Sequence, residues 1–394
     1  MVLACVFLGA GRFHPLIPRA RARYLDKGTI ILYNLRNRFR KPVSETGFSL
    51  LLEDLMVVTM EDVAEKAGVS KTTVSRIING IPNSASLDTI ERVRRTIEEL
   101  DYVPNIIAAS LKKLVTKTIG LIVGDIENPF FGAVIKGIET TLRNAGYNLI
   151  LANSSYDMDR EEELARVLLE RMVDAIIFAP SRQKPGEWLQ IASDRGVNIV
   201  LIDNDIPGLA VDHVGVDNFK ASYEATQYLI DLGHKKLAMI TGPHYRSTSS
   251  NRKRGFLSAL EDRSIAIDQA FLKEGDYGIE SGYEKTKELI ELDSPPTALF
   301  IANNFMTAGA MKAIYEEGLK IPDDISILGF DDMYWYTTTQ PPVSAIAQPA
   351  YDIGRVAAER VLRSFKSQGK AAPRKIELKT KLLIRKSTAA PKEK

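Results

Sequence analysis

The sequence predicts an α-helical helix-turn-helix headpiece followed by a larger α/β core of two lobes, each built on a doubly wound parallel sheet. Two patterns support this fold class. Within residues 56–103, helix-length segments with apolar residues at helical spacing are joined by a glycine turn. Beyond Lys117, short runs rich in Ile, Val and Leu alternate with amphipathic segments, and this alternation occurs twice. A length of 394 residues with 45% apolar residues excludes a fibrous or wholly disordered chain.

Composition and charge narrow the classes of protein further. Cys5 is the only cysteine, so an intrachain disulfide is impossible and an oxidising compartment is not required. No apolar run reaches the roughly 20 residues that span a bilayer, and Val2–Ala10 lacks the basic residues that precede a signal-peptide core. We therefore expect a cytoplasmic protein without a membrane segment. The net charge of +2 means that any nucleic-acid binding must depend on local clusters of Lys and Arg.

Residues 1–55 form a basic extension. Between Arg12 and Lys41 the basic residues greatly outnumber the single acid, Asp26, and no apolar period is sustained. This composition is typical of a disordered tail. The alternative is a mis-assigned start, with translation beginning at Met56 or Met60, directly before the first clear helix signal.

Residues 56–103 carry start and stop signals for three short helices. Thr59 and Asp62 have the spacing of a capping box, which satisfies free amides in the first turn of a helix. Gly68 can adopt the left-handed conformation of a tight turn, and Ser70 can cap the next helix. A third helix is predicted to start near Ser86 and to end before Pro104. Helix, glycine turn and helix together indicate a helix-turn-helix.

The outward face of the second predicted helix suits contacts with DNA. Because Val74 and Ile78 face the small core, the side chains that project from this helix are Lys71, Thr72, Ser75 and Arg76. The first half of such a helix reaches base edges in the major groove, where arginine can contact guanine through two hydrogen bonds. Phosphate contacts are expected from Ser70, Thr73 and Asn79. The alternative is an ordinary helical hairpin with a solvated polar face.

The segment Val58–Asn79, VTMEDVAEKAGVSKTTVSRIIN, resembles the headpiece of the lactose-repressor (LacI/GalR-type) family of bacterial transcription regulators. The resemblance continues through Leu383. It implies that residues 104–117 form a hinge helix and linker, in which Leu111 wedges into the minor groove at the centre of the operator. An apolar wedge of this kind unstacks a base step and bends DNA. Lys112 would then contact a flanking phosphate.

The core shows the strand pattern of an open parallel sheet. The predicted strands are Thr118–Val123, Tyr147–Ala152, Asp174–Phe178, Asn198–Ile202, Lys236–Thr241, Ala298–Ile301 and Ser326–Phe330. The resemblance implies a periplasmic-binding-protein-like core over residues 118–390, in which the chain crosses three times between the lobes. Lobe 1 is expected at about 118–217 and 347–372, and lobe 2 at about 218–346 and 373–390. Ligands of such sheets bind at the carboxyl ends of the strands, so a cleft is expected between the lobes.

The sequence contains none of the common catalytic motifs. A phosphate-binding loop ending in Gly-Lys-Ser/Thr, a Gly-x-Ser-x-Gly elbow, a His-Glu-x-x-His pair and a dinucleotide-binding Gly-x-Gly-x-x-Gly are all absent. Four scattered histidines and one cysteine do not form a typical zinc site. We therefore expect a binding protein with no catalytic residues, no metal and no cofactor.

Several residues at the predicted strand ends suit a compact polar ligand. Asp125, Phe130 and Phe131 follow the first strand, where aromatic faces can stack on a sugar ring or a base and a carboxylate can accept hydroxyl hydrogen bonds. The alternative for the two phenylalanines is a purely structural place in the core.

The resemblance places further effector contacts in both lobes. Arg246, Thr248 and Arg252 fall on ligand-contacting positions of the family, Tyr277 falls on an aromatic wall, and Asp203 matches a polar contact. For Arg252 the alternative is a salt bridge between the lobes.

One position departs from the family pattern. Asn304 follows Ala302-Asn303 at a position where the resemblance leads us to expect an aspartate that accepts hydrogen bonds from the effector. Asparagine carries no charge and can also donate. With Arg246 and Arg252 near by, the loss of a carboxylate favours an acidic ligand, such as a sugar acid or sugar phosphate. The alternative is that Asn304 adjusts the recognition of a neutral sugar.

Together these features and the resemblance predict a bacterial transcription regulator that is cytoplasmic and nucleoid-associated. We expect it to act as a repressor of carbohydrate-related genes. The family resemblance implies a homodimer on a pseudo-palindromic double-stranded operator, controlled by a small sugar, sugar acid or sugar phosphate. The sign of the response, induction or corepression, stays open. The alternatives are a sugar-binding protein on the same two-lobed core without a regulatory role, and a cytosolic enzyme on that core.

Overall fold

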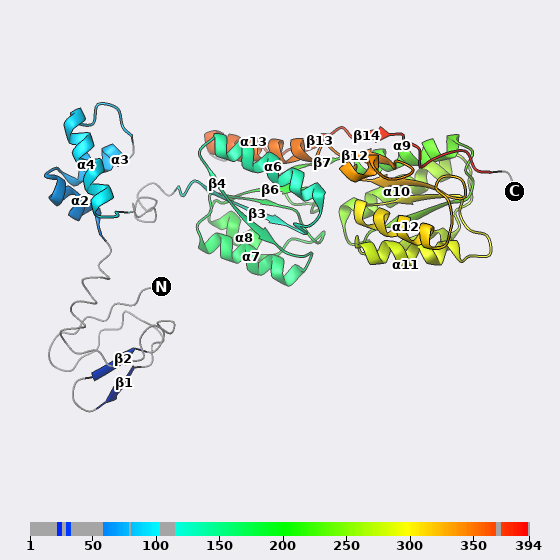
Figure 1. The fold of residues 1–394 in the computed structure, drawn as a ribbon, viewed down its shortest axis with the longest axis horizontal. Helices are drawn as coiled ribbons and strands as arrows, with labels where there is room; N and C mark the ends of the chain where they lie inside the picture. Colours follow the sequence, from blue (N-terminus) through cyan, green and yellow to red (C-terminus); the bar gives the residue numbers. More distant parts are fainter. Residues whose placement is uncertain are drawn as a thin grey trace. The chain divides into compact units, whose positions relative to one another are not determined.

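The structure, a computed structural model, describes residues 22–25, 29–32, 58–78, 80–102, 115–367 and 372–392 (Figure 1). The chain divides into two compact units, residues 1–109 and 110–394. In the basic extension, β1 (Ala22–Leu25) and β2 (Thr29–Leu32) pair in antiparallel fashion. This pair differs from the predicted lack of regular structure in the extension. In the described part of the chain, no helix combines the length and the apolar character needed to cross a membrane.

The headpiece consists of three helices, as the capping pattern predicts. They are α2 (Met60–Ala67), α3 (Lys71–Ile78) and α4 (Leu87–Glu99). Thr59 and Asp62 form the predicted capping box, and Ser86 caps α4 by accepting from the Thr89 amide. Gly68 ends α2 with φ of +63°, in the left-handed region where glycine has no steric penalty.

A small apolar cluster holds the three helices together. Val63 from α2, Val74 from α3 and Val93 from α4 are fully buried in it. The partly buried residues around them include Ile78, Ile90, Ile97 and Leu100. Since each helix is only two to four turns long, we expect this shared cluster, rather than helix propensity, to stabilise the headpiece.

Lobe 1 is built on a six-stranded sheet in which all pairings are parallel. In spatial order the strands are β13 (Lys375–Leu378), β7 (Asp212–Val216), β6 (Asn198–Ile202), β5 (Ala175–Phe178), β3 (Thr118–Val123) and β4 (Asn148–Asn153). The helices are α6 (Pro129–Asn144) and α13 (Ala350–Ser367), which pack together on one face, and α7 (Met158–Glu170) and α8 (Glu187–Asp194) on the other (Figure 1).

Lobe 2 repeats this plan. Its strands in spatial order are β14 (Lys381–Leu383), β12 (Ser344–Ala347), β11 (Ser326–Phe330), β10 (Ala298–Ile301), β8 (Leu237–Thr241) and β9 (Leu272–Glu274). Only β14 runs antiparallel to its neighbour. The helices are α9 (Asn218–Asp231), α10 (Ser247–Asp262), α11 (Ile279–Ile290) and α12 (Asn304–Glu316), with the short 3-10 helices η1 (Gln269–Phe271) and η2 (Tyr334–Thr337). The predicted fold class, with doubly wound, mainly parallel sheets in two lobes, is therefore confirmed.

The chain crosses between the lobes after β7, after β12 and after β13. The last crossover differs from the predicted boundary at residue 373, because β13 pairs with β7 and extends the sheet of lobe 1 to Leu378. The lysine and glutamate that alternate in β13 hid this strand in the sequence, since an edge strand needs little apolar character.

Glycines allow the covering helices to pack closely. In the α6–α13 pair, a Cβ on Gly137 would lie 2.1 Å from the Tyr351 carbonyl oxygen. A Cβ on Gly354 would lie 2.0 Å from the Val134 carbonyl oxygen. The two helices therefore meet backbone to backbone at a glycine from each side.

Candidate functional site

The exposed face of α3 contains most of the predicted DNA-contacting residues. Lys71, Thr72 and Arg76 are exposed, whereas Thr73 and Ser75 are half-buried. Lys71 pairs with Glu61 of α2, with 2.6 Å between Nζ and the carboxylate. The Ser70 hydroxyl accepts from the Thr73 amide at 3.1 Å and so caps α3.

The remaining predicted DNA contacts cannot be placed. Asn79 and the hinge residues Leu111 and Lys112 lie outside the described residues. Among the ion pairs of the described residues, none involves Arg76, which therefore presents its guanidinium on the surface of the headpiece.

A cavity of about 30 Å³, which we call the inner cavity, lies between the two lobes of the core. Its walls come from residues just beyond the carboxyl ends of strands in both sheets. This is the position expected for ligands of open α/β sheets. The inner cavity is lined by Asn128, Phe130, Phe131, Tyr156, Asp203, Arg246, Thr248, Arg252, Tyr277, Asn303, Asp331 and Gln348.

The two lobes contribute matching residues to the inner cavity. The first residue after β6 is Asp203, and the first after β11, the equivalent strand of lobe 2, is Asp331. The third residue after the edge strand β4 is Tyr156, and the third after the edge strand β9 is Tyr277. All four have a left-handed backbone, with φ of 61°, 73°, 58° and 77°, respectively. Such conformations are uncommon in residues other than glycine and concentrate at functional sites.

The tyrosines are accommodated by matching glycines. Gly124 follows β3 and Gly242 follows β8, its equivalent in lobe 2. A Cβ on Gly124 would lie 1.9 Å from the Tyr156 ring, and a Cβ on Gly242 would lie 2.2 Å from the Tyr277 ring. Each tyrosine therefore lies over a strand end that only glycine leaves open.

Arg252 is held in lobe 2 by a set of short contacts. It is only 3% exposed. Its Nε donates to the Asn218 side-chain oxygen at 2.8 Å, and its Nη1 donates to the Ala302 carbonyl at 2.6 Å. The guanidinium lies 3.5 Å from the centre of the Phe330 ring. These contacts fix the positive charge of Arg252 at the cavity wall. The alternative role predicted for Arg252 was a salt bridge between the lobes, and the ion pairs of the described residues do not include one that involves Arg252.

Arg246 is the second buried arginine of the inner cavity, at 3% exposed. Its guanidinium lies 3.7 Å from the centre of the Tyr156 ring and 5.1 Å from that of Tyr277. The buried Nε has no hydrogen-bond partner among the described residues. A buried donor without a partner costs folding free energy, so an acceptor atom of a ligand is expected to bind to this Nε.

The carboxylates of the inner cavity are poorly solvated. Burial raises the pKa of Asp203 to about 6, although Arg252 and Arg246 oppose the rise. Burial also raises the pKa of Asp331 above its usual range, with Arg252 again opposing. The Gln348 amide donates to Asp331 at 2.6 Å. The cavity thus opposes two carboxylates to two guanidinium groups, and each carboxylate can accept hydrogen bonds.

Direct hydrogen bonds connect the lobes around the inner cavity. The Asn204 side-chain oxygen, from lobe 1, accepts from the Thr248 amide at 3.2 Å and from its hydroxyl at 3.0 Å. On the other side, the Asn304 amide of lobe 2 donates to the Asn128 side-chain oxygen of lobe 1 at 2.9 Å. These bonds hold the lobes close together, which explains why the inner cavity is much smaller than a sugar ring requires.

The structure brings seven of the nine predicted effector residues to the inner cavity. They are Phe130, Phe131, Asp203, Arg246, Thr248, Arg252 and Tyr277. Phe130 and Phe131 also belong to the apolar core of lobe 1, so the functional and structural interpretations both apply. Their role in effector binding stays a prediction.

The other two predicted residues lie elsewhere. Asp125 does not line the inner cavity; its carboxylate accepts from the Glu127 amide at 2.9 Å in the turn before α6. Asn304 does not line it either, because its amide bonds to Asn128 and its oxygen accepts from the Phe305 amide. A contact between Asn304 and the effector stays a prediction, and the inner cavity contains a further carboxylate, that of Asp331.

Five lining residues were not predicted: Asn128, Tyr156, Asn303, Asp331 and Gln348. Asp331 was detectable in principle, because it follows a predicted strand directly, as Asp203 does. Tyr156 and Gln348 carry no local signal, since each lies in a loop whose course depends on how the lobes pack.

Two family models match the chain. The family described as bacterial regulatory proteins, lacI family, matches residues 59–105. The family described as periplasmic binding proteins and sugar binding domain of LacI family matches residues 116–386. In the described part of the chain, no group of three or more His, Cys, Asp or Glu residues is arranged to hold a metal ion.

Individual relatives agree with these matches. The HTH-type transcriptional regulator DegA of Bacillus subtilis (strain 168) is 35% identical over 337 residues, which cover 85% of this chain and 99% of that protein. The crystal structure of the lac repressor dimer bound to operator and the anti-inducer ONPF superposes with a TM-score of 0.74 at 26% identity, covering 84% of this chain and 99% of that chain. The transcriptional regulator CelR in complex with cellobiose superposes with a TM-score of 0.64 at 29% identity, covering 84% and 99%.

Proposed function

Because the chain belongs to the lacI family of bacterial regulatory proteins, we propose that it is a transcriptional repressor whose affinity for its operator is set by a small sugar in the inner cavity. The observation that carries this proposal is the presence, in one chain, of a headpiece with an exposed polar helix and a core whose two lobes close on buried arginines and carboxylates. The headpiece argues against a sugar-binding protein without a regulatory role, since such a protein needs no DNA-reading helix.

The charge balance of the inner cavity favours an uncharged effector. Arg246 and Arg252 face Asp203 and Asp331, so an added anion has no surplus positive charge to meet. Carboxylates, guanidinium groups and the Asn303 amide together offer acceptors and donors for hydroxyl groups. Tyrosine rings offer faces for an apolar ring surface. A neutral sugar fits this set better than a sugar acid or sugar phosphate.

The effector acts on DNA binding through the separation of the lobes. In a homodimer, two α3 helices contact the two halves of a pseudo-palindromic operator, and opening or closing of the lobes changes the spacing of the hinge segments. Allostery requires that the sugar bind one lobe arrangement more tightly, which typically amounts to ~1–3 kcal/mol of coupling. This role needs no catalytic step, and it places the protein in the cytoplasm with the chromosome.

The central test is a selection of bound duplexes from random DNA by the full-length protein, carried out with and without monosaccharides and disaccharides. We expect enrichment of a palindromic sequence and a change in its recovery with one sugar. The proposal is refuted if, at modest ionic strength, the recovered duplexes show no enriched sequence relative to the starting pool, with any sugar or without sugar.

The hinge provides a second test. Leu111→Ala is expected to reduce operator bending and specific affinity, because alanine is too short to unstack a base step, while leaving nonspecific affinity nearly unchanged. Circular-permutation gel shifts measure the bend. If the bend angle of the variant equals that of the wild-type complex, Leu111 is not a wedge.

A further inference from the structure

A second and larger cavity shares a wall with the inner cavity, and we call it the outer groove. Its volume is about 410 Å³, whereas that of the inner cavity is about 30 Å³. Only the outer groove falls within the ~300–1,000 Å³ of ordinary small-molecule sites. Phe130, Asp331 and Gln348 line both cavities, so one ligand can extend from the inner cavity into the outer groove.

Both lobes form the outer groove. Its apolar lining comes from the start of α6, the segment after β11 and the start of α13: Pro129, Phe130, Ala133, Met333, Pro349 and Ala350. Tyr334 of lobe 2 and Tyr351 of lobe 1 also line it, and these residues are 84% and 42% exposed. Exposed aromatic rings beside an apolar surface suit the apolar face of a sugar ring, whose hydroxyls stay in water.

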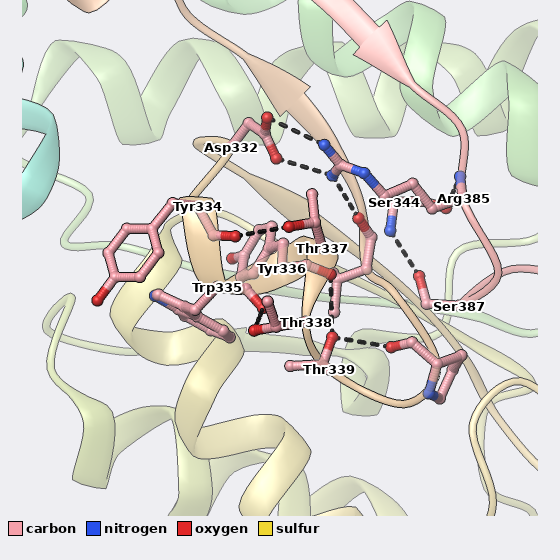
Figure 2. A network of polar contacts seen from close by, with 12 residues as sticks. Asp332, Tyr334, Trp335, Tyr336, Thr337, Thr338, Thr339, Ser344, Arg385 and Ser387 are labelled. Carbon is pink, nitrogen blue, oxygen red and sulfur yellow. Dashed lines mark hydrogen bonds and ion pairs between the residues drawn. The ribbon is translucent and has the colours of Figure 1, made fainter.

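The backbone that carries Tyr334 is held firmly. Asp332 accepts from Arg385 through two hydrogen bonds of 2.7 and 3.0 Å, and the Arg385 amide donates to the Ser344 hydroxyl at 2.8 Å. The Thr337 hydroxyl donates to the Tyr334 carbonyl at 2.8 Å and closes η2. Figure 2 shows that the Tyr334 ring points away from this network, and the ring is therefore free to contact a ligand. Because the backbone is fixed, only the two side-chain torsions of Tyr334 have to be ordered when a ligand binds.

The outer groove and the inner cavity differ in charge. The described residues that line the outer groove include Asp331, Asp332 and Asp352 but no lysine or arginine. Arg385 neutralises Asp332, and Arg355 approaches Asp352 with 3.0 Å between Nε and the carboxylate. A hydroxyl group therefore meets carboxylate acceptors in the outer groove, whereas a phosphate or carboxylate meets no lysine or arginine among the described lining residues.

We propose that the outer groove is the subsite for a second, uncharged sugar ring, so that the effector is a disaccharide or a similar glycoside. This inference rests on the proposed function, because it takes the effector to be a sugar. One ring reaches the arginines and carboxylates of the inner cavity once the lobes part. The other ring stacks on Tyr334 or Tyr351 and turns its hydroxyls toward the carboxylates.

The test is calorimetric titration of the full-length protein with matched pairs of sugars: glucose with cellobiose, glucose with maltose, and galactose with lactose. We expect at least one disaccharide to bind more tightly than its monosaccharide. Tyr334→Ala is expected to weaken that disaccharide by about two- to tenfold, which corresponds to the loss of one stacking contact, without changing the affinity for the monosaccharide. The matched control is Tyr315→Ala, since Tyr315 is 44% exposed on α12 and lines neither cavity.

Three results overturn the inference: no disaccharide that binds better than its monosaccharide, an equal loss for both in Tyr334→Ala, or an equal loss for the disaccharide in Tyr315→Ala. The charge argument fails if a phosphate on the outer ring of the disaccharide strengthens binding. None of these results affects the selection of duplexes by the same protein without sugar, so failure of the outer subsite and failure of the proposed regulator are distinguishable.

Discussion

The headpiece and the core hold their functional residues in opposite ways. In the headpiece, Lys71 and Arg76 are neighbours on a single short helix, and the same helix buries Val74 against the core of the headpiece. In the core, Tyr156 and Asp331 line one cavity although they lie far apart in the sequence and belong to different lobes. The exposed face of one helix can be predicted from the spacing of apolar residues in one segment. The residues that line a cavity between two sheets depend on the packing of the whole domain.

The same contrast applies to the energetic role of the residues. The exposed residues of α3 can change with little loss of stability, because they contact mainly solvent and the ion pair of Lys71 with Glu61 is itself exposed. In the core, Arg252 and its partners are buried, so residues that recognise the effector also hold the lobe together. Substitutions of the exposed α3 residues should therefore change DNA recognition with little change in stability. Substitutions of the buried core residues should change effector recognition and stability together.

The largest effect is expected from Arg252→Ala. The variant leaves Asn218 and the Ala302 carbonyl without their donor, and it removes the positive charge that faces Asp203 and Asp331. We expect the free energy of unfolding of the core to fall by roughly 2–5 kcal/mol. We also expect the response of operator binding to sugar to be abolished. Chemical denaturation and operator binding with sugar measure the two effects. Arg254→Ala, two residues further on the exposed face of the same helix, is the control; equal losses in both variants would contradict the assigned role.

Gly137→Ala tests the glycine contact between α6 and α13. The new Cβ would lie 2.1 Å from the Tyr351 carbonyl oxygen, so the helices must separate, at an expected cost of about 1–3 kcal/mol in unfolding free energy. Gly132→Ala lies in the same helix, with nothing within 4 Å of the new Cβ, and should be neutral or slightly stabilising. Thermal unfolding of the two variants decides the matter, and similar melting temperatures would show that close packing does not matter here.

Arg76→Ala addresses the headpiece alone. We expect a loss of roughly 1–3 kcal/mol in operator binding, with relaxed preference at one base pair and no change in core stability. Binding to a set of operators with single base changes measures the preference. Arg95→Ala, on the exposed face of α4, serves as the comparison. A uniform loss on every sequence would make Arg76 a phosphate contact instead.

The smallest effect concerns the pH dependence of the core. The pKa of Asp203 rises from 3.8 to about 6 on folding, so the folded protein binds more protons than the unfolded chain between these values. The contribution of Asp203 to stability is therefore fully present below about pH 4 and is lost as the pH rises through about 6. Asp203→Asn should remove this part of the dependence and unfold at a higher temperature than the wild type above pH 6. Parallel pH profiles for the two proteins would mean that the Asp203 carboxylate does not titrate in this range.

Much of the fold was predictable because its signals are local. Two headpiece helices start where the sequence predicts: α2 at the capping pair of Thr59 and Asp62, and α4 at the cap Ser86. Seven strands of the core were visible as apolar runs, but the buried parallel strands β7 and β12 were missed, because their Asp, His, Ser, Gly and Ala residues interrupt such a run. The strands β9, β13 and β14 were also missed, because they are short, lie at sheet edges and contain lysine or glutamate.

The candidate site was predictable only in part. Arg252 and Tyr277 were found through their resemblance to family positions, and the structure places both at the inner cavity. Neighbouring residues at the start of α12 point in different directions: Asn303 lines the cavity and caps the helix, while Asn304, whose role as an effector contact stays a prediction, bonds across to Asn128. One residue of displacement on a helix changes the direction of a side chain by about 100°, which no linear pattern resolves.

The sequence by itself determined the headpiece helices, the central strands of the core, the division into a headpiece and a core, and the face of α3 that is exposed, because caps, apolar periods and glycine turns act over a few residues. Only the tertiary structure decided that Asp331 and Tyr156 meet Asp203 and Tyr277 in matching positions, and that Tyr334 and Tyr351 line one groove. Those meetings depend on the twist of two sheets and on how closely their lobes approach, and both are properties of the packed domain.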